Sequence, residues 1–239
     1  MAIYVMSDIH GLKSRFDAMI TTLSLQEEDK IYILGDIIDR GKDGIAILQS
    51  VMKDDRFTLI MGNHELMMLE YYEDQKEALP NEEYALRWAR NGCTPTMEAF
   101  QKCTEEEQEA MLSYLKNCPL AISDVIVRDK VYYLVHGAPI LSLRSGNAYL
   151  HSDFMKLFSP HDFVWNRLNG KERPFEDRCV IVGHTITSFY QMDRPYRIWS
   201  DHQDLDKAHL IDMDCGCACD DDNTQLACLR LDDLKVFYE

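Results

Sequence analysis

The fold is decided by one stretch, Ile31-Tyr32-Ile33-Leu34-Gly35-Asp36-Ile37-Ile38-Asp39-Arg40-Gly41. Its first half is β-branched and aromatic, as is typical of a short buried strand. Its second half places two carboxylates and an arginine directly after that strand, where a loop commonly carries functional side chains. Taken alone, such a tract is better explained by a solvated turn. Its meaning therefore depends on the rest of the chain.

Four other polar clusters follow short apolar runs in the same way. The clusters are Asp8-Ile9-His10-Gly11, Gly62-Asn63-His64-Glu65, Val135-His136-Gly137-Ala138 and Gly183-His184-Thr185. Helical stripes of apolar residues lie between the first three runs, so the chain opens as strand, helix, strand, helix. This alternation predicts a parallel arrangement in an α/β fold. Because parallel strands end at one edge of a sheet, we expect the five clusters to meet there.

The middle and end of the chain predict further elements. From 66 to about 118 the sequence is rich in Glu, Met and Tyr at helical spacing, which predicts a helical insertion or cap. Two strands, 121–127 and 131–135, follow as a hairpin, and 139–177 lacks a clear period, as is typical of a long functional loop region. Runs near 208–213, 225–231 and 235–238 predict closing strands.

Length and charge limit the function. With 239 residues, we expect residues 1–239 to form a single domain. The 25 basic residues against 41 acidic ones give a formal charge of -16, which disfavours nucleic-acid or anionic-membrane partners. There is no long apolar run and no basic segment at the amino terminus, so the sequence predicts a cytoplasmic protein.

The eight cysteines are expected to be free thiols, because the chain is large and carries no export signal. Cys215, Cys217 and Cys219 alternate, and Cys228 lies nearby, which raises the alternative of a structural zinc. Their spacing differs from that of a zinc knuckle, so we expect small buried thiols instead.

The side chains at the strand exits suggest a metal centre. Asp8, His10, Asp36, Asn63, His136 and His184 offer a mixture of carboxylate, imidazole and amide donors. This mixture suits Mn, Fe or Zn better than Ca, and six donors are too many for one tetrahedral ion. Two ions about 3.5–4 Å apart, sharing one carboxylate, would use them all. Asp36 is the expected bridging ligand, although any one of these residues taken singly is better explained by a structural role.

The five clusters together resemble the signature of the calcineurin-like metallophosphoesterases. The resemblance extends from residue 3 to about 190 and is greatest to the phosphoprotein phosphatase branch in its compact bacterial and lambda-phosphatase-like form. It implies two mixed β-sheets stacked as a sandwich and flanked by helices, with a dimetal site at one edge. It also implies a serine/threonine protein phosphatase that uses two divalent ions, with Mn favoured over Fe or Zn, and in-line attack by a hydroxide held between them.

The resemblance assigns a role to each residue. It places Asp8, His10 and Asp36 on one metal ion, and Asp36, Asn63, His136 and His184 on the other. His64 would protonate the leaving oxygen and Asp39 would orient His64. Arg40 and Arg167, together with Asn63, would bind the phosphoryl group.

Two departures from the family pattern bear on the substrate. Met61 stands where eukaryotic-type members often carry a phosphate-binding arginine, and Cys93 replaces the second glycine of the block W-x-x-N-G-G-x-x-T that begins at Trp88. Diadenosine tetraphosphate hydrolases share the same five clusters, but commonly carry alanine at position 39 and aspartate at position 65. The sequence therefore favours a phosphoprotein over a small phosphorylated substrate such as a dinucleotide. A noncatalytic scaffold is a third hypothesis, which the complete set of metal-binding residues disfavours.

Overall fold

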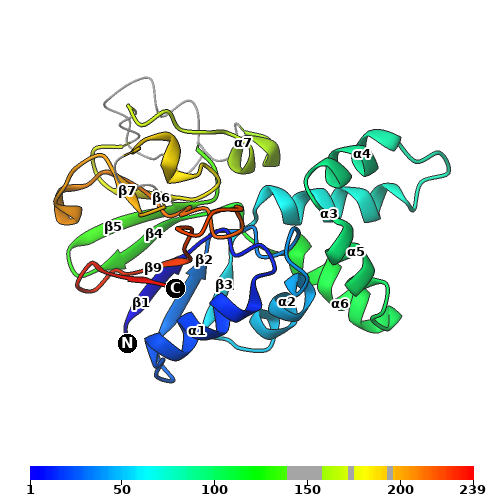
Figure 1. Cartoon of the computed structure of the whole chain (residues 1–239), viewed down its shortest axis with the longest axis horizontal. Coiled ribbons are helices and arrows are strands. Elements are labelled where there is room, and N and C mark those ends of the chain that lie inside the picture. Colours follow the sequence, from blue (N-terminus) through cyan, green and yellow to red (C-terminus); the bar gives the residue numbers. More distant parts are fainter. Residues whose placement is uncertain (139–157, 172–174, 193–195) are drawn as a thin grey trace.

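The computed structural model describes residues 1–138, 158–171, 175–192 and 196–239. Within these residues the chain forms two five-stranded sheets flanked by helices (Figure 1). The first sheet contains β1 (Ile3–Met6), β2 (Lys30–Ile33), β3 (Phe57–Leu59), β9 (Ala227–Arg230) and β10 (Lys235–Tyr238). The second contains β4 (Ala121–Val127), β5 (Lys130–Val135), β6 (Cys179–Val182), β7 (Trp199–Ser200) and β8 (Leu210–Asp212).

Both sheets are mixed. The first has the order β10-β9-β1-β2-β3, in which β1, β2 and β3 are parallel and the last two strands of the chain add in antiparallel fashion. The second has the order β4-β5-β6-β8-β7, with β5, β6 and β8 parallel. The prediction that the strands at the clusters run parallel is confirmed, and so is the mixed two-sheet architecture.

Alternate side chains of β1 enter two different cores, one of which is shared with the second sheet, so the sheets stack. Ile3 and Val5 of β1 pack with Leu134 of β5 between the sheets. Tyr4 and Met6 of the same strand pack in the second core, with the helices. A strand with apolar residues on both faces reads as a continuous hydrophobic run, and this is the pattern that the sequence shows.

The helices have two locations. α1 and α2 pack on the outer face of the first sheet, whereas α3 to α6 form a group beside the sandwich (Figure 1). The helical segments are α1 (Lys13–Leu23), α2 (Gly44–Met52), α3 (Asn63–Asp74), α4 (Glu82–Arg90), α5 (Thr94–Phe100), α6 (Glu105–Lys116), α7 (Pro160–Val164), η3 (Thr187–Phe189) and η4 (Leu205–Lys207). The predicted insertion is helical, but its first helix begins at Asn63, three residues earlier than expected, so candidate site residues lie in its first turn.

The predicted loop region is only partly covered. Residues 139–157 and 172–174 lie outside the described residues, and the remainder contains one short helix, α7, which the sequence analysis did not predict. Ser159 and Asp162 cap its first turn. The strand β7 was also missed, because two residues are too few to show a period.

All eight cysteines are free, and Cys215, Cys217 and Cys228 are buried.

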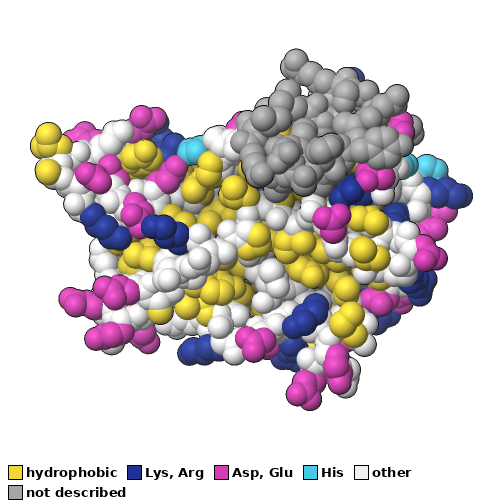
Figure 2. Space-filling view, turned by 180° about the vertical axis from the view of Figure 1, so that it is seen from behind, with side chains coloured by type: hydrophobic (Ala, Val, Ile, Leu, Met, Phe, Trp, Pro, Cys, Tyr) yellow, Lys and Arg dark blue, Asp and Glu magenta, His cyan; other side chains and the backbone are white. Residues whose placement is uncertain are grey.

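No helix in the described part of the chain has the length and apolarity needed to span a membrane. On the face shown in Figure 2, acidic and basic side chains are interspersed around the edge and hydrophobic side chains occupy the middle.

Candidate active site

The strand exits are held in a strained backbone conformation. Of the ten non-glycine residues with positive φ in the described ranges, six belong to the predicted site. Left-handed backbone is unfavourable for residues with a Cβ, and such strain concentrates where function requires a fixed side-chain direction. The six residues are Asp8, His10, Asp36, Asp39, Arg40 and His184.

The two oxygens of the Asp36 carboxylate face two different imidazoles. Oδ2 lies 3.6 Å from Nε2 of His10, and Oδ1 lies 3.4 Å from Nε2 of His136. Gly62 permits this arrangement, because a Cβ at that position would collide with Oδ1 of Asp36. The strand exits of β1, β2 and β5 therefore meet around one carboxylate, as expected.

Each histidine of the cluster has one ring nitrogen fixed by a backbone carbonyl. Nδ1 of His10 lies 3.1 Å from the oxygen of Ile38, and Nδ1 of His136 lies 2.5 Å from that of Leu34. His184 uses the other nitrogen, with Nε2 at 3.2 Å from the oxygen of Trp165. A metal-binding histidine commonly bonds in this way through its second nitrogen, which fixes its tautomer and ring direction.

The electrostatics of the cluster also suit a cation. Burial lowers the pKa of His10 well below its ordinary value and lowers that of His184 to about 2, so both imidazoles are neutral and keep a lone pair. Burial, together with the nearby Asp8, raises the pKa of Asp36 well above its ordinary value. Carboxylates gathered in a buried site without a counter-charge are unfavourable, and bound cations relieve this.

Two groups of residues can each hold a metal ion in the described part of the chain. Within each group the donor atoms lie within 4.8 Å of one another. One group is Asp36, His136 and His184, and Asn63 adjoins it with Oδ1 2.9 Å from Nε2 of His136. The other is His10, Asp36 and His64, with Asp8 close by, 4.0 Å from Nε2 of His10. The residues present fit two divalent ions.

His64 and Asp39 form a buried pair beside this cluster. Nδ1 of His64 lies 2.6 Å from Oδ2 of Asp39, which also accepts a hydrogen bond from Nε1 of Trp88 at 2.8 Å. Burial alone would lower the pKa of His64, but the carboxylates of Asp36 and Asp39 outweigh burial and raise it. A histidine that retains its proton in this way is suited to donate it.

Residues of the helical insertion hold the pair of His64 and Asp39 in place. Trp88 lies at the end of α4, and Oγ1 of Thr96 in α5 accepts a hydrogen bond from the backbone N–H of Asp39 at 2.8 Å. The oxygen of Gly92 accepts another from the N–H of Arg40 at 3.0 Å. The W-x-x-N-G-C-x-x-T block therefore positions the loop after β2, and Cys93 is buried within it.

Arg40 and Arg167 line the same cavity and are both exposed. Nη1 of Arg167 donates to the oxygen of His184 at 2.6 Å, and Nη2 of Arg40 lies 3.4 Å from Nε2 of His64. His64 is fully buried and does not line the cavity. Met61 is buried in the core, so its side chain makes no contribution to this cavity.

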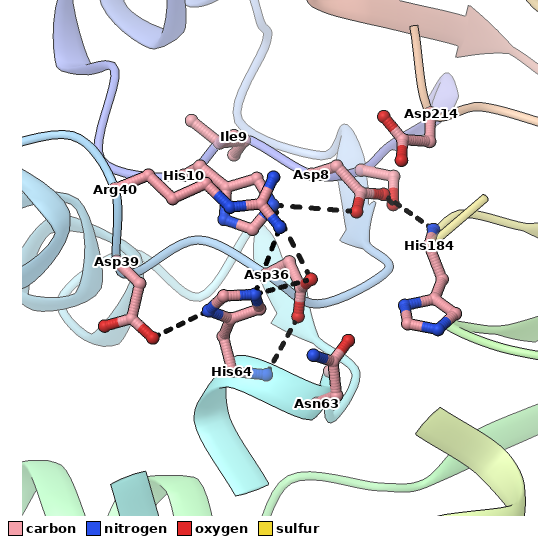
Figure 3. A network of polar contacts seen from close by, with 12 residues as sticks. Asp8, Ile9, His10, Asp36, Asp39, Arg40, Asn63, His64, His184 and Asp214 are labelled. Carbon is pink, nitrogen blue, oxygen red and sulfur yellow. Dashed lines mark hydrogen bonds and ion pairs between the residues drawn. The ribbon is translucent and has the colours of Figure 1, made fainter. Parts of the chain in front are cut away.

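The sequence analysis missed two residues at the site. The carboxylate of Glu65 is fully buried and accepts hydrogen bonds from the backbone N–H groups of Asp36, Ile37 and Gly62. Asp214, which follows β8, is 5% exposed, lines the cavity and lies next to Asp8 (Figure 3). The Asp214 position carries the same signal as the others, a carboxylate directly after an apolar run, although its run is short and interrupted by Asp212.

The cavity has a volume of ≈ 680 Å³, a size typical of small-molecule sites. Asp8, His10, Asp36 and Asn63 contribute to its lining. A larger cavity of ≈ 970 Å³ lies at the amino ends of β5, β6 and β8, and its lining includes none of the predicted site residues. We therefore place the candidate active site in the smaller cavity.

A family profile for calcineurin-like phosphoesterases matches residues 1–214. The chain belongs to that family. The match covers every cluster that surrounds Asp36, and it extends to Asp214 at the edge of the cavity.

Among curated relatives of this phosphoesterase, several are symmetrical bis(5'-nucleosyl)-tetraphosphatases. The one from Wigglesworthia glossinidia brevipalpis is 35% identical over 79 residues, which cover 32% of this chain and 29% of the relative. The one from Chromohalobacter salexigens is 24% identical over 132 residues, which cover 52% and 41%. The chain thus matches only 29% and 41% of the length of these two relatives.

Solved structures share the fold over the whole chain. A candidate diadenosine tetraphosphatase has a TM-score of 0.63 at 13% identity, with 100% of this chain and 92% of that chain covered. A protein serine/threonine phosphatase from Saccharomyces cerevisiae has a TM-score of 0.58 at 16% identity, with 100% and 79% covered. At these identities the likeness concerns the fold alone.

Proposed function

We propose that this phosphoesterase uses two divalent cations to hydrolyse small nucleotide substrates, with dinucleoside tetraphosphates as the leading class. The observation that carries the dimetal part is the Asp36 carboxylate, whose two oxygens face His10 and His136 separately. The substrate class rests on the curated relatives that act on bis(5'-nucleosyl) tetraphosphates. This choice reverses the preference for a phosphoprotein that the sequence analysis gave, because the relatives favour its alternative.

The residues of the site would have separate roles in binding the cations and the phosphate chain. Asp8, His10 and Asp36 would hold one cation, and Asp36, Asn63, His136 and His184 the other. The bound cations would supply Lewis-acid activation of the attacking water and of the phosphoryl oxygens. Arg40 and Arg167, at the rim, would orient the phosphate chain by charge-assisted hydrogen bonds.

A phosphomonoester substrate, such as phosphoserine or phosphothreonine in a protein, is the second candidate. The observation that favours it is the buried pair of His64 and Asp39, at 2.6 Å. A serine or threonine alkoxide is a poor leaving group and needs a proton from such a pair. A nucleotide phosphate leaves as a stable anion and has little need of one, so the pair has a clearer use on a phosphomonoester.

Turnover of the two substrate classes would decide between these candidates. Diadenosine tetraphosphate and a phosphoserine peptide should be supplied separately to the same Mn-loaded protein, and kcat/KM measured for each. We expect the larger value for the dinucleotide. A larger value for the peptide would restore the phosphoprotein phosphatase, and no turnover of either would leave the noncatalytic scaffold.

A further inference from the structure

The candidate active site has a second side that the dimetal chemistry does not use. Besides the carboxylates and imidazoles, the cavity is lined by five apolar or aromatic side chains, which we call the aromatic wall. Hydrolysis of a phosphate by metal ions and arginines requires no such surface. The aromatic wall consists of Trp165, Leu168, Ile186, Phe189 and Tyr190.

Phe189 is the exposed member of the wall. Its side chain is 74% exposed, and among the large exposed hydrophobic side chains of the described residues it alone lines this cavity. Large apolar side chains that remain exposed at the edge of a cavity commonly mark a place where a ligand is bound.

The exposure of Phe189 does not follow from a loosely held segment. Thr187 is fully buried, and its N–H donates to the oxygen of Asp214 at 2.9 Å. Tyr190, on the other side, stacks on Trp199 with ring centroids 4.8 Å apart, and its hydroxyl donates to Asp212 at 3.2 Å. The chain is anchored on both sides of Phe189, at Thr187 and Tyr190, so the backbone of η3 keeps Phe189 at the cavity.

The wall is adjacent to the proposed metal centre. The ring of Trp165 lies edge-on to that of His184, with centroids 6.1 Å apart, and its carbonyl oxygen fixes Nε2 of His184. A ligand that reaches both sides must therefore carry an anionic group next to a flat apolar group. Among phosphorylated compounds, a nucleotide has this combination, because its base offers an aromatic face to stack on.

We propose that the aromatic wall is a subsite for the base of a nucleotide, and that Phe189 is the side chain on which the base stacks. This inference rests on the proposed function, in which the phosphate of the same nucleotide occupies the cluster around Asp36. It identifies the part of the substrate that is recognised, and predicts little preference among bases, since every base presents an aromatic face.

Binding of AMP and of ribose 5-phosphate to the Mn-loaded protein tests this inference, because the two differ only in the base. We expect wild-type protein to bind AMP about tenfold more tightly, which corresponds to about 1.4 kcal/mol. Phe189→Ala should weaken the binding of AMP to near that of ribose 5-phosphate and leave the binding of ribose 5-phosphate unchanged. Phe189→Tyr should keep the preference for AMP. Met192→Ala is the matched control, since Met192 is 92% exposed and does not line the cavity.

Equal binding of AMP and ribose 5-phosphate by wild-type protein would overturn the inference. So would an equal loss of both ligands in Phe189→Ala, which would indicate a structural defect. Calorimetric titration measures these affinities independently of dinucleotide hydrolysis. A failure to hydrolyse dinucleotides would therefore contradict the proposed function while a preference for AMP still supported the subsite.

Discussion

Oε2 of Glu65 lies 2.7 Å from the backbone nitrogen of Asp36, so the first turn of α3 is bonded to the loop that carries the central carboxylate. The same oxygen accepts from Gly62 at 3.1 Å, and Oε1 accepts from Ile37 at 2.9 Å. One buried side chain thus joins the exits of β2 and β3. Only a group with acceptors alone can satisfy all of these N–H donors.

Glu65→Gln should therefore destabilise the protein. Its amide NH₂ would face a backbone N–H, which leaves buried donors without an acceptor at a cost of about 1–3 kcal/mol. The free energy of unfolding, measured by urea denaturation in the presence of chelator, should fall by that amount. Glu73→Gln, on the exposed part of the same helix, is the control and should change it by less than about 0.5 kcal/mol. Equal stability of both variants would show that the Glu65 bonds contribute nothing.

Asp212 predicts how stability depends on pH. Burial raises the pKa of this fully buried carboxyl well above its ordinary value, and the neighbouring Asp214 raises it further. The folded protein therefore holds a proton that the unfolded chain releases. The stabilising contribution is complete below the unfolded pKa of about 3.9, and it is lost as the pH rises through the folded value.

Asp212→Asn should remove this loss, because an amide keeps the shape without ionising. Its melting temperature should exceed that of wild type at pH 8, and the difference should shrink as the pH falls towards 4. Each kcal/mol of difference corresponds to about 2–4 °C in a chain of this size. Asp55→Asn, at an exposed position, should show no such trend. A difference that grows as the pH falls would contradict this account of Asp212.

The sequence predicted the strand exits well, because each exit is a local pattern of an apolar run followed by polar residues. For that reason Asp8, Asp36 and His136 were expected to lie close together, and they do, although His136 follows a strand of the second sheet. The partners of those residues were harder to predict, since Trp88 and Thr96 contact Asp39 across 49 and 57 positions of sequence. No periodicity encodes such a contact.

Two other features could not be predicted from the sequence, each for a different physical reason. Glu65 belongs to one of the predicted clusters, but its structural role depends on backbone N–H groups that carry no sequence signal. Phe189 lies in a segment for which the sequence predicted no element. Only the packing of Thr187 and Tyr190 shows that its ring is held at the cavity.

Asp36→Asn tests the metal centre itself. A neutral amide in place of the shared carboxylate should abolish binding of at least one of two Mn ions, measured by elemental analysis after dialysis. Asp17→Asn, on the exposed face of α1, should bind as wild type does. Mn should also raise the melting temperature of wild type, since a ligand at 100 times its Kd stabilises by about 2.7 kcal/mol. Full Mn content in Asp36→Asn would rule out a bridging role.

His64→Ala tests the proton donor. Turnover of an alkyl phosphomonoester should fall about a hundredfold or more, because its alkoxide leaves without a proton. Turnover of diadenosine tetraphosphate should fall by much less, since a phosphate leaves as a stable anion. The two kcat/KM values should be measured beside Mn content, with His202→Ala, an exposed histidine outside the cavity, as control.

The result for His64→Ala also decides between two roles that the geometry allows for His64. Its Nε2 lies 3.8 Å from Oδ2 of Asp36, close enough for His64 to act as a ligand instead. If His64 is a metal ligand, His64→Ala should lose Mn, and kcat/KM should fall equally for both substrates. Asp39→Asn should reproduce the substrate-dependent loss with Mn retained, because within the described residues the Asp39 side chain reaches the cluster through Nδ1 of His64. Loss of Mn in Asp39→Asn would instead extend the metal centre to the whole pair.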